Sequence, residues 1–150
     1  MRTLKRFEEY LAEGIARKES PDRQRAASLR KESDRKMRSL KQNLKKVGVD
    51  EDNANDYAEY CYDTLLLLIR AKLHAEGYST AGRGAHEAEV AYLRNLSIAE
   101  ADIRFLDQLR YFRNGILYYG KELDITYAKQ VITFTKKMQP QLKKLLGDLP

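Results

Sequence analysis

Apolar residues recur at three- and four-residue steps along most of the chain, which is the spacing of amphipathic helices. The first such segment lies within residues 1–20, where Leu4, Phe7, Leu11 and Ile15 share one face. Charged and apolar residues alternate there too closely for a signal peptide. We therefore predict a short extra helix at the N-terminus, in front of the main bundle.

The next two predicted helices differ in polarity. From Asp22 to about Val47 only a narrow stripe is apolar, and the other positions are polar and mostly basic. A third helix begins between Asp50 and Asn55 and reaches about Glu76. It is apolar nearly all round, and a helix of that kind is normally buried. We expect the third helix to form the centre of the core.

Two further helices are predicted after a loop. Residues 78–84 contain two glycines and are typical of an exposed loop. A helix follows over about residues 85–96. Ser97, with Glu100 three residues later, matches a capping box, so a fifth helix is predicted to start there. It ends near Gly120.

A last helix is predicted from Ile125 to about Leu145, with a kink at Pro140. Six helices and few breakers predict an all-α, up-and-down helical bundle in a single domain of residues 1–150. The longest apolar run, residues 65–69, is far shorter than the roughly 20 residues of a membrane span. The single cysteine cannot form an internal disulfide. We therefore expect a cytoplasmic protein that does not enter a membrane.

The net charge of +6 is concentrated in the first third of the chain. Residues 1–48 hold fifteen Lys/Arg against seven Asp/Glu, whereas the remainder holds thirteen against fifteen. A polyanion such as RNA would relieve the self-repulsion of the basic second helix and release counterions. Its candidate phosphate contacts are Arg30, Arg35, Arg38 and Lys41. A merely solvated cationic face explains the same pattern, because this helix lacks the aromatic residues that grip single-stranded RNA.

A second candidate site lies in the predicted helix over residues 97–120. Helical geometry places Arg110 and Arg113 on one line with three aliphatic residues, Ile103, Leu106 and Leu117. An arginine set among aliphatic side chains needs a carboxylate, a partner subunit or an anionic ligand. Pairing with a local acid such as Asp107 is therefore one alternative, and binding of a phosphate is another.

Residues 113–118, Arg-Asn-Gly-Ile-Leu-Tyr, resemble the signature of the HEPN family. In that family the penultimate long helix carries an Arg, usually followed by Asn, Asp or His, then three residues and a His. The aromatic-rich segment 57–78 and the Gly-Ala-His of residues 84–86 resemble two further landmarks of the family. The resemblance covers about residues 27–145, and it departs from the family at Tyr118, which stands where the histidine is usual.

HEPN proteins include metal-independent ribonucleases, many of them toxins paired with a nucleotidyltransferase-like antitoxin, and non-catalytic RNA- or nucleotide-binding domains. The resemblance therefore implies a site formed by Arg113, Asn114 and Tyr118. The position of Arg110 among aliphatic residues of the same helix makes it a further candidate phosphate contact. It also implies a homodimer through the 97–120 helix, a nucleotidyltransferase-like antitoxin as partner, and no cofactor. The two histidines and one cysteine have no spacing typical of a metal site.

Tyr118 argues against catalysis. A histidine near neutral pKa suits the removal of a proton from a 2′-hydroxyl, whereas the pKa of tyrosine is near 10. Arg113 can still hold a phosphate, Asn114 can orient it, and Tyr118 can stack on a base. An RNA- or nucleotide-binding module in a toxin–antitoxin or defence pair is our first hypothesis. A ribonuclease in which Tyr118 or His86 transfers the proton and a protein–protein interaction bundle are the alternatives.

Overall fold

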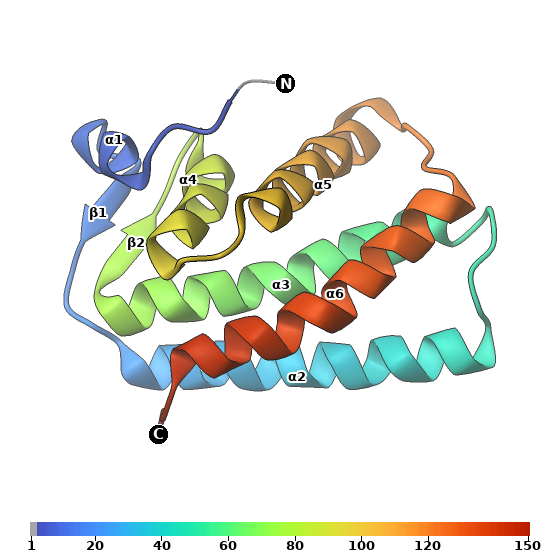
Figure 1. The fold of residues 1–150 in the computed structure, drawn as a ribbon, viewed down its shortest axis with the longest axis horizontal. Coiled ribbons are helices and arrows are strands. Elements are labelled where there is room, and N and C mark those ends of the chain that lie inside the picture. The colour runs from blue at the N-terminus through green and yellow to red at the C-terminus, as the bar shows by residue number, and fades with distance from the viewer. Residues whose placement is uncertain (1–2) are drawn as a thin grey trace.

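The computed structural model describes residues 3–150 and arranges them as a bundle of six α-helices (Figure 1). This confirms the predicted all-α class. The elements in chain order are α1 (Phe7–Ala12), β1 (Ala16–Lys18), α2 (Arg23–Lys46), α3 (Ala54–Glu76), β2 (Tyr78–Thr80), α4 (Ala85–Ala91), the 3₁₀ turn η1 (Tyr92–Leu96), α5 (Glu100–Tyr119) and α6 (Ile125–Leu146). Within residues 3–150, no helix is both long and apolar enough to cross a membrane.

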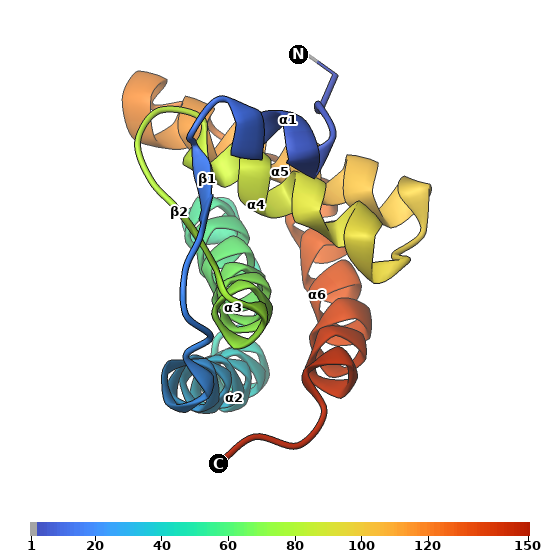
Figure 2. The same ribbon diagram turned by 90° about the vertical axis from the view of Figure 1, so that its left-hand side faces the viewer.

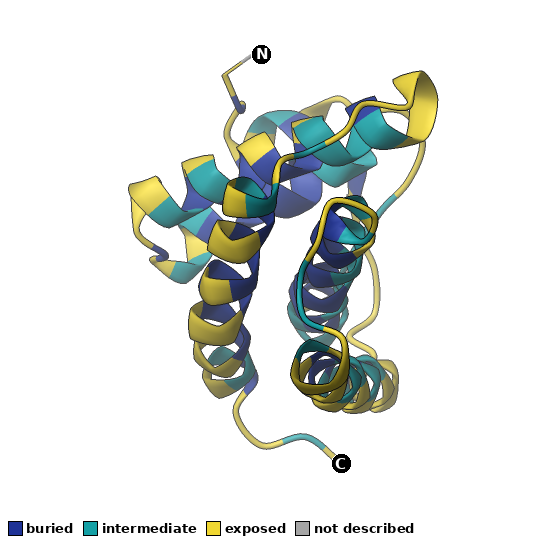
Figure 3. Ribbon diagram, turned by 90° about the vertical axis from the view of Figure 1, so that its right-hand side faces the viewer, coloured by how far each residue is buried: buried dark blue, intermediate teal, exposed yellow. Residues whose placement is uncertain are grey.

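Helix α3 is the centre of the bundle, as its nearly uniform apolar surface predicts. Twelve of its 23 residues are buried. It packs against α2 and α6, and also against α4 and α5. Figure 2 shows α2 and α5 on opposite sides of the layer that α3 and α6 form. Buried residues gather on the facing sides of α3 and α6, whereas α2 turns an exposed face to solvent (Figure 3).

The N-terminal helix is shorter than predicted, and part of the expected loop is a strand. Helix α1 covers six residues, and β1 then pairs antiparallel with β2, with Ala16 opposite Thr80. The prediction of an exposed loop over residues 78–84 is therefore wrong for its first three residues, which are half-buried. The two strands lie about sixty residues apart in the chain. Pairing over such a separation leaves no periodic signal in either short segment.

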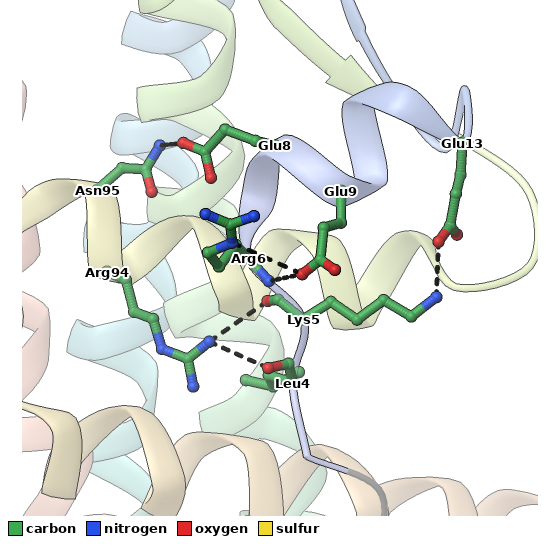
Figure 4. A network of polar contacts seen from close by, with 8 residues as sticks. All are labelled: Leu4, Lys5, Arg6, Glu8, Glu9, Glu13, Arg94 and Asn95. Atoms are coloured by element: carbon green, nitrogen blue, oxygen red, sulfur yellow. Dashed lines mark hydrogen bonds and ion pairs between the residues drawn. The ribbon is translucent and has the colours of Figure 1, made fainter.

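The N-terminal segment packs on the bundle of its own chain (Figure 4). Nη1 of Arg94 donates to the backbone carbonyls of Leu4, at 3.1 Å, and Lys5, at 3.3 Å. The buried Phe7 ring lies 4.7 Å from the ring of Tyr92, measured between centroids. These contacts fix the segment beside η1. The first two residues of the predicted N-terminal helix lie outside the described residues.

The start of α5 also differs from its prediction. Ser97 adopts a left-handed conformation with φ of 59°, and the helix begins at Glu100. Ser97 therefore cannot cap the helix, and the predicted capping box is wrong. The Glu100 carboxylate instead forms an ion pair with Arg94, with 2.9 Å between Nη2 and Oε1. Helix α6 continues through Pro140 to Leu146.

Candidate functional site

Arg113, the central residue of the predicted site, points from α5 toward α3. Its Nη2 lies 3.0 Å from Oδ1 of Asp63, and its guanidinium carbon lies 5.2 Å from the centroid of the Tyr62 ring. Its side chain is 20% exposed. The sequence left open whether this arginine meets a carboxylate, a second subunit or a ligand, and the structure supplies a carboxylate of the same chain. Nothing in the sequence indicated Asp63, because it lies fifty residues upstream.

Arg110 is also neutralised within the chain. Its Nε donates to Oδ1 of Asp107 at 2.8 Å, and its Nη1 lies 3.9 Å from Oε1 of Glu87. Both Arg110 and Asp107 are buried. Asp107, the local acid that the sequence suggested as an alternative partner, is therefore the observed partner of Arg110. With its guanidinium enclosed and paired, Arg110 is not placed to contact a phosphate in solution.

Asn114 and Tyr118 lie on a different line of α5 from Arg113. Asn114 is half-buried, whereas Tyr118 projects into solvent and is 76% exposed. Helix α5 continues without a break through Gly115, so the five-residue step from Arg113 to Tyr118 keeps its separation of about 140° around the axis. The structure therefore does not bring Arg113 and Tyr118 of one chain onto one phosphate.

A second ionic group, unforeseen from the sequence, links α3 to α4. The Glu89 carboxylate is 1% exposed, and its Oε2 accepts from Nε of Arg70 at 2.7 Å. Nδ1 of His86 lies 3.4 Å from Oε1 of Glu89 without the geometry of a hydrogen bond. Burial alone would raise the pKa of Glu89, but the adjacent imidazole and guanidinium outweigh it and hold the pKa below its usual value. Sequence spacing could have suggested the proximity of His86 and Glu89, which lie three residues apart on one helix. It could not have suggested Arg70, which lies on another helix.

Carboxylates outnumber guanidinium groups in this α3–α4–α5 region. Three arginines, Arg70, Arg110 and Arg113, face four acids, Asp63, Glu87, Glu89 and Asp107. Glu59 lies near Arg113 as well, and its pKa is raised by burial and by two neighbouring acids of α3. A region with this balance of charge offers a polyanion no net attraction. The predicted α5 site therefore has the arginines that the sequence indicated, but not the positive field that RNA would need.

Helix α2 has the opposite balance. Its residues include ten Lys/Arg and two acids. Among the predicted contacts, Arg35 pairs with Glu32, and Arg30 donates to the carbonyl of Gly147 at 3.3 Å. The remaining two, Arg38 and Lys41, are exposed, and neither forms an ion pair within residues 3–150. The same holds for three more lysines of this helix, Lys31, Lys45 and Lys46.

The predicted site residues thus form two separate groups. The α5 group and the α2 group lie on opposite sides of the α3–α6 layer (Figure 2). Only the α2 group combines exposure with unpaired positive charge. In residues 3–150, no three carboxylate, imidazole or thiol side chains converge closely enough to hold a metal ion.

The chain matches no protein-family model, no curated protein and no solved structure. The all-α bundle therefore rests on the structure itself. The resemblance to HEPN proteins stays a prediction drawn from the motif of residues 113–118 and its two supporting segments.

Proposed function

We propose that this protein is an HEPN-like RNA-binding module that contacts phosphates through the exposed face of α2. The observation that supports this most directly is the set of unpaired cations on that face, Lys31, Arg38, Lys41, Lys45 and Lys46. Their charges are held within one rigid element. A polyanion laid along the helix would replace their mutual repulsion by attraction and release its own counterions.

Catalysis is not part of this proposal. Arg113 is occupied by Asp63, and Tyr118 stands apart from it on the same helix. The two residues therefore do not form the acid–base pair that cleavage of RNA without a metal requires. Under this proposal the α5 arginines stabilise the bundle, and RNA meets the opposite side of the molecule.

The outer face of α5 is proposed as the contact with a second copy of the chain. Its C-terminal end exposes Tyr111, Leu117, Tyr118 and Tyr119, which are four of the five large hydrophobic residues exposed within residues 3–150. Apolar groups gathered in this way mark contact surfaces. As the HEPN resemblance implies, such a dimer would act in a toxin–antitoxin or defence pair with a nucleotidyltransferase-like antitoxin.

The proposal is tested by measuring RNA binding against salt concentration. Fluorescence anisotropy with a labelled RNA gives the slope of log K against log salt. For the double variant Arg38→Gln, Lys41→Gln, we expect the slope to fall by about 2, one for each lost phosphate contact. Arg104→Gln removes an exposed cation from α5 and is the matched control; its slope should equal that of the wild type.

Three results would overturn the proposal. One is loss of binding in Arg113→Gln with no effect of the α2 double variant, which would place the RNA on α5. The second is cleavage of the labelled RNA in gels, abolished by Arg113→Ala and accompanied by growth arrest on overexpression. That result would establish the ribonuclease alternative. The third is absence of any RNA binding, with a protein that co-purifies instead, which would favour the interaction bundle.

A further inference from the structure

Three of the unpaired cations of α2 follow a straight line. Lys31, Arg38 and Lys45 recur at seven-residue steps, so they share one face of the helix and lie about 10.5 Å apart. Lys41 and Lys46 flank this line. All five are exposed on a helix that runs unbroken from Arg23 to Lys46. The spacing of the charges is therefore fixed by the backbone and not by flexible loops.

The line continues into a basic hollow between α2 and α6. Arg30, Lys143 and Lys144 line this hollow, together with Asp34. Asp34 is occupied by Lys143, at 2.9 Å from Nζ to Oδ1, and by the side-chain amide of Gln139 at 3.0 Å. Arg30 and Lys144 therefore keep the hollow positively charged. The hollow widens the row of exposed cations, which we call the α2 strip (Lys31, Arg38, Lys41, Lys45 and Lys46), at the N-terminal half of α2.

Few rings near this strip are open to a base: Tyr57 and Tyr60 of α3 line a hollow beside the end of α2, and Tyr57 is buried. Helix α2 contains no aromatic residue in its 24 positions. The neighbouring ring of Tyr60 is covered by Lys36, whose Nζ lies 4.3 Å from the ring centroid. The exposed tyrosines at the end of α5 lie across the α3–α6 layer (Figure 1). Single-stranded RNA gains much of its affinity by stacking bases on aromatic side chains, and helix α2 supplies none.

We propose that the α2 strip recognises the paired phosphate backbone of double-stranded RNA in preference to a single strand. This inference rests on the proposed function and names the class of RNA. A duplex presents its phosphates as a rigid array with its bases turned inward, so a rigid row of cations meets them without stacking and without ordering a flexible strand. Recognition is by shape and charge and is independent of sequence.

The preference can be worked out from the number of cations. Each phosphate contact contributes about 0.9 to the salt slope for a duplex and about 0.7 for a single strand. Five contacts give slopes near −4.5 and −3.5, so between 1 M and 0.1 M salt the duplex gains about tenfold more affinity than the single strand. If the two forms bind equally at 1 M salt, where the electrostatic contribution is small, the duplex should bind about tenfold tighter at 0.1 M salt.

The test measures binding of one RNA sequence, about 20 nucleotides long, as a single strand and as a duplex with its complement, in 0.1 M salt. The expected result is tighter duplex binding that an unrelated duplex of equal length reproduces. Lys31→Gln, Arg38→Gln and Lys45→Gln, singly and combined, should lower the duplex slope by about 0.9 for each replaced cation. Arg104→Gln should leave it unchanged. Glutamine is a good helix former, so the fold is retained, and circular dichroism checks it.

The outcomes separate the inference from the proposed function. Equal or tighter binding of the single strand overturns the duplex preference and leaves RNA binding by α2 in place. If Tyr118→Ala also weakens the binding of the single strand, bases stack on the tyrosines at the end of α5. That result contradicts the inference that RNA binds without stacking. If neither RNA form binds above the level of the combined α2 variant, the proposed function itself fails.

Discussion

Replacement of Arg70 by methionine tests whether Glu89 is held in the interior by its guanidinium partner. Glu89 is 1% exposed, and Arg70 contacts both of its oxygens, at 2.7 Å from Nε and 3.4 Å from Nη2. Methionine keeps the aliphatic length and removes the charge. Removing one partner of a buried ion pair costs about 3–5 kcal/mol, because it strands the other charge. Arg70 is itself partly exposed and His86 remains nearby, so we expect about 2–3 kcal/mol.

The cost of this substitution should depend on pH. In the wild type the pKa of Glu89 is lowered from its ordinary value of 4.5, so the stabilising contribution is present above that value and is lost as the pH falls through the folded pKa. In Arg70→Met, burial without the guanidinium raises the pKa of Glu89 instead. The buried carboxyl then becomes neutral at low pH and no longer requires a partner. The difference between variant and wild type should therefore be largest near neutral pH, shrink as the pH falls through the variant's raised pKa, and vanish below the folded pKa of the wild type.

Urea unfolding followed by circular dichroism measures both effects. With a urea dependence of about 2 kcal/mol per molar, a loss of 2–3 kcal/mol lowers the midpoint by about 1–1.5 M at pH 7. Arg35→Met is the matched control, since its ion pair with Glu32 is exposed to solvent, and it should leave the urea midpoint nearly unchanged. The reasoning is refuted if Arg70→Met costs no more than this control, or if its cost is the same at pH 4 and pH 7.

Three further substitutions or treatments test the structure. Burial raises the pKa of the Cys61 thiol to about 11, so alkylation at pH 8 should be at least about a hundredfold slower in the native protein than in urea. Gly77→Ala places a Cβ 2.6 Å from a backbone carbonyl oxygen at a residue whose φ is +84°. Its cost in stability should exceed the roughly 1 kcal/mol expected for Gly120→Ala, where φ is +63° but the space around the Cβ is open. Thermal unfolding measures the stability of both variants. Tyr118→Ala combined with Tyr119→Ala should weaken self-association by about tenfold or more in sedimentation equilibrium if α5 forms the proposed dimer contact.

Local patterns predicted the long helices well because the apolar residues of each helix are the ones that become buried. Helix α3 runs from Ala54 to Glu76, and its predicted end at Glu76 is confirmed. Gly77 adopts the left-handed conformation that ends such a helix. Helix α2 likewise lies within its predicted bounds. In both cases periodicity and end signals lie within the segment itself, so no knowledge of distant residues was required.

The contacts of the candidate site could not be predicted in the same way. Arg113 meets Asp63 and Arg70 meets Glu89 across helix interfaces, and the approach of two helices is not encoded in the spacing of either one. Asp107 was foreseen as a partner of Arg110 because it lies three residues away on the same helix. The strands β1 and β2 were missed for a related reason, since three-residue strands acquire their pairing only from the packed bundle.

The distribution of charge between the two sides of the bundle bears on the HEPN resemblance. If Arg113 served a ribonuclease centre, the RNA would have to displace Asp63 from Arg113 or bind beside it. Glu59, whose pKa is already raised by burial and by neighbouring acids, would also lie close to the phosphate. Helix α2, on the far side of the α3–α6 layer, instead carries a row of five exposed cations without ion pairs to any of residues 3–150. A polyanion follows the field of the whole molecule before it reaches any single motif. Under the proposed function, the arginine of the motif and the RNA-binding surface are therefore separate parts of this protein, which is why we assign binding to α2 and a structural role to Arg113.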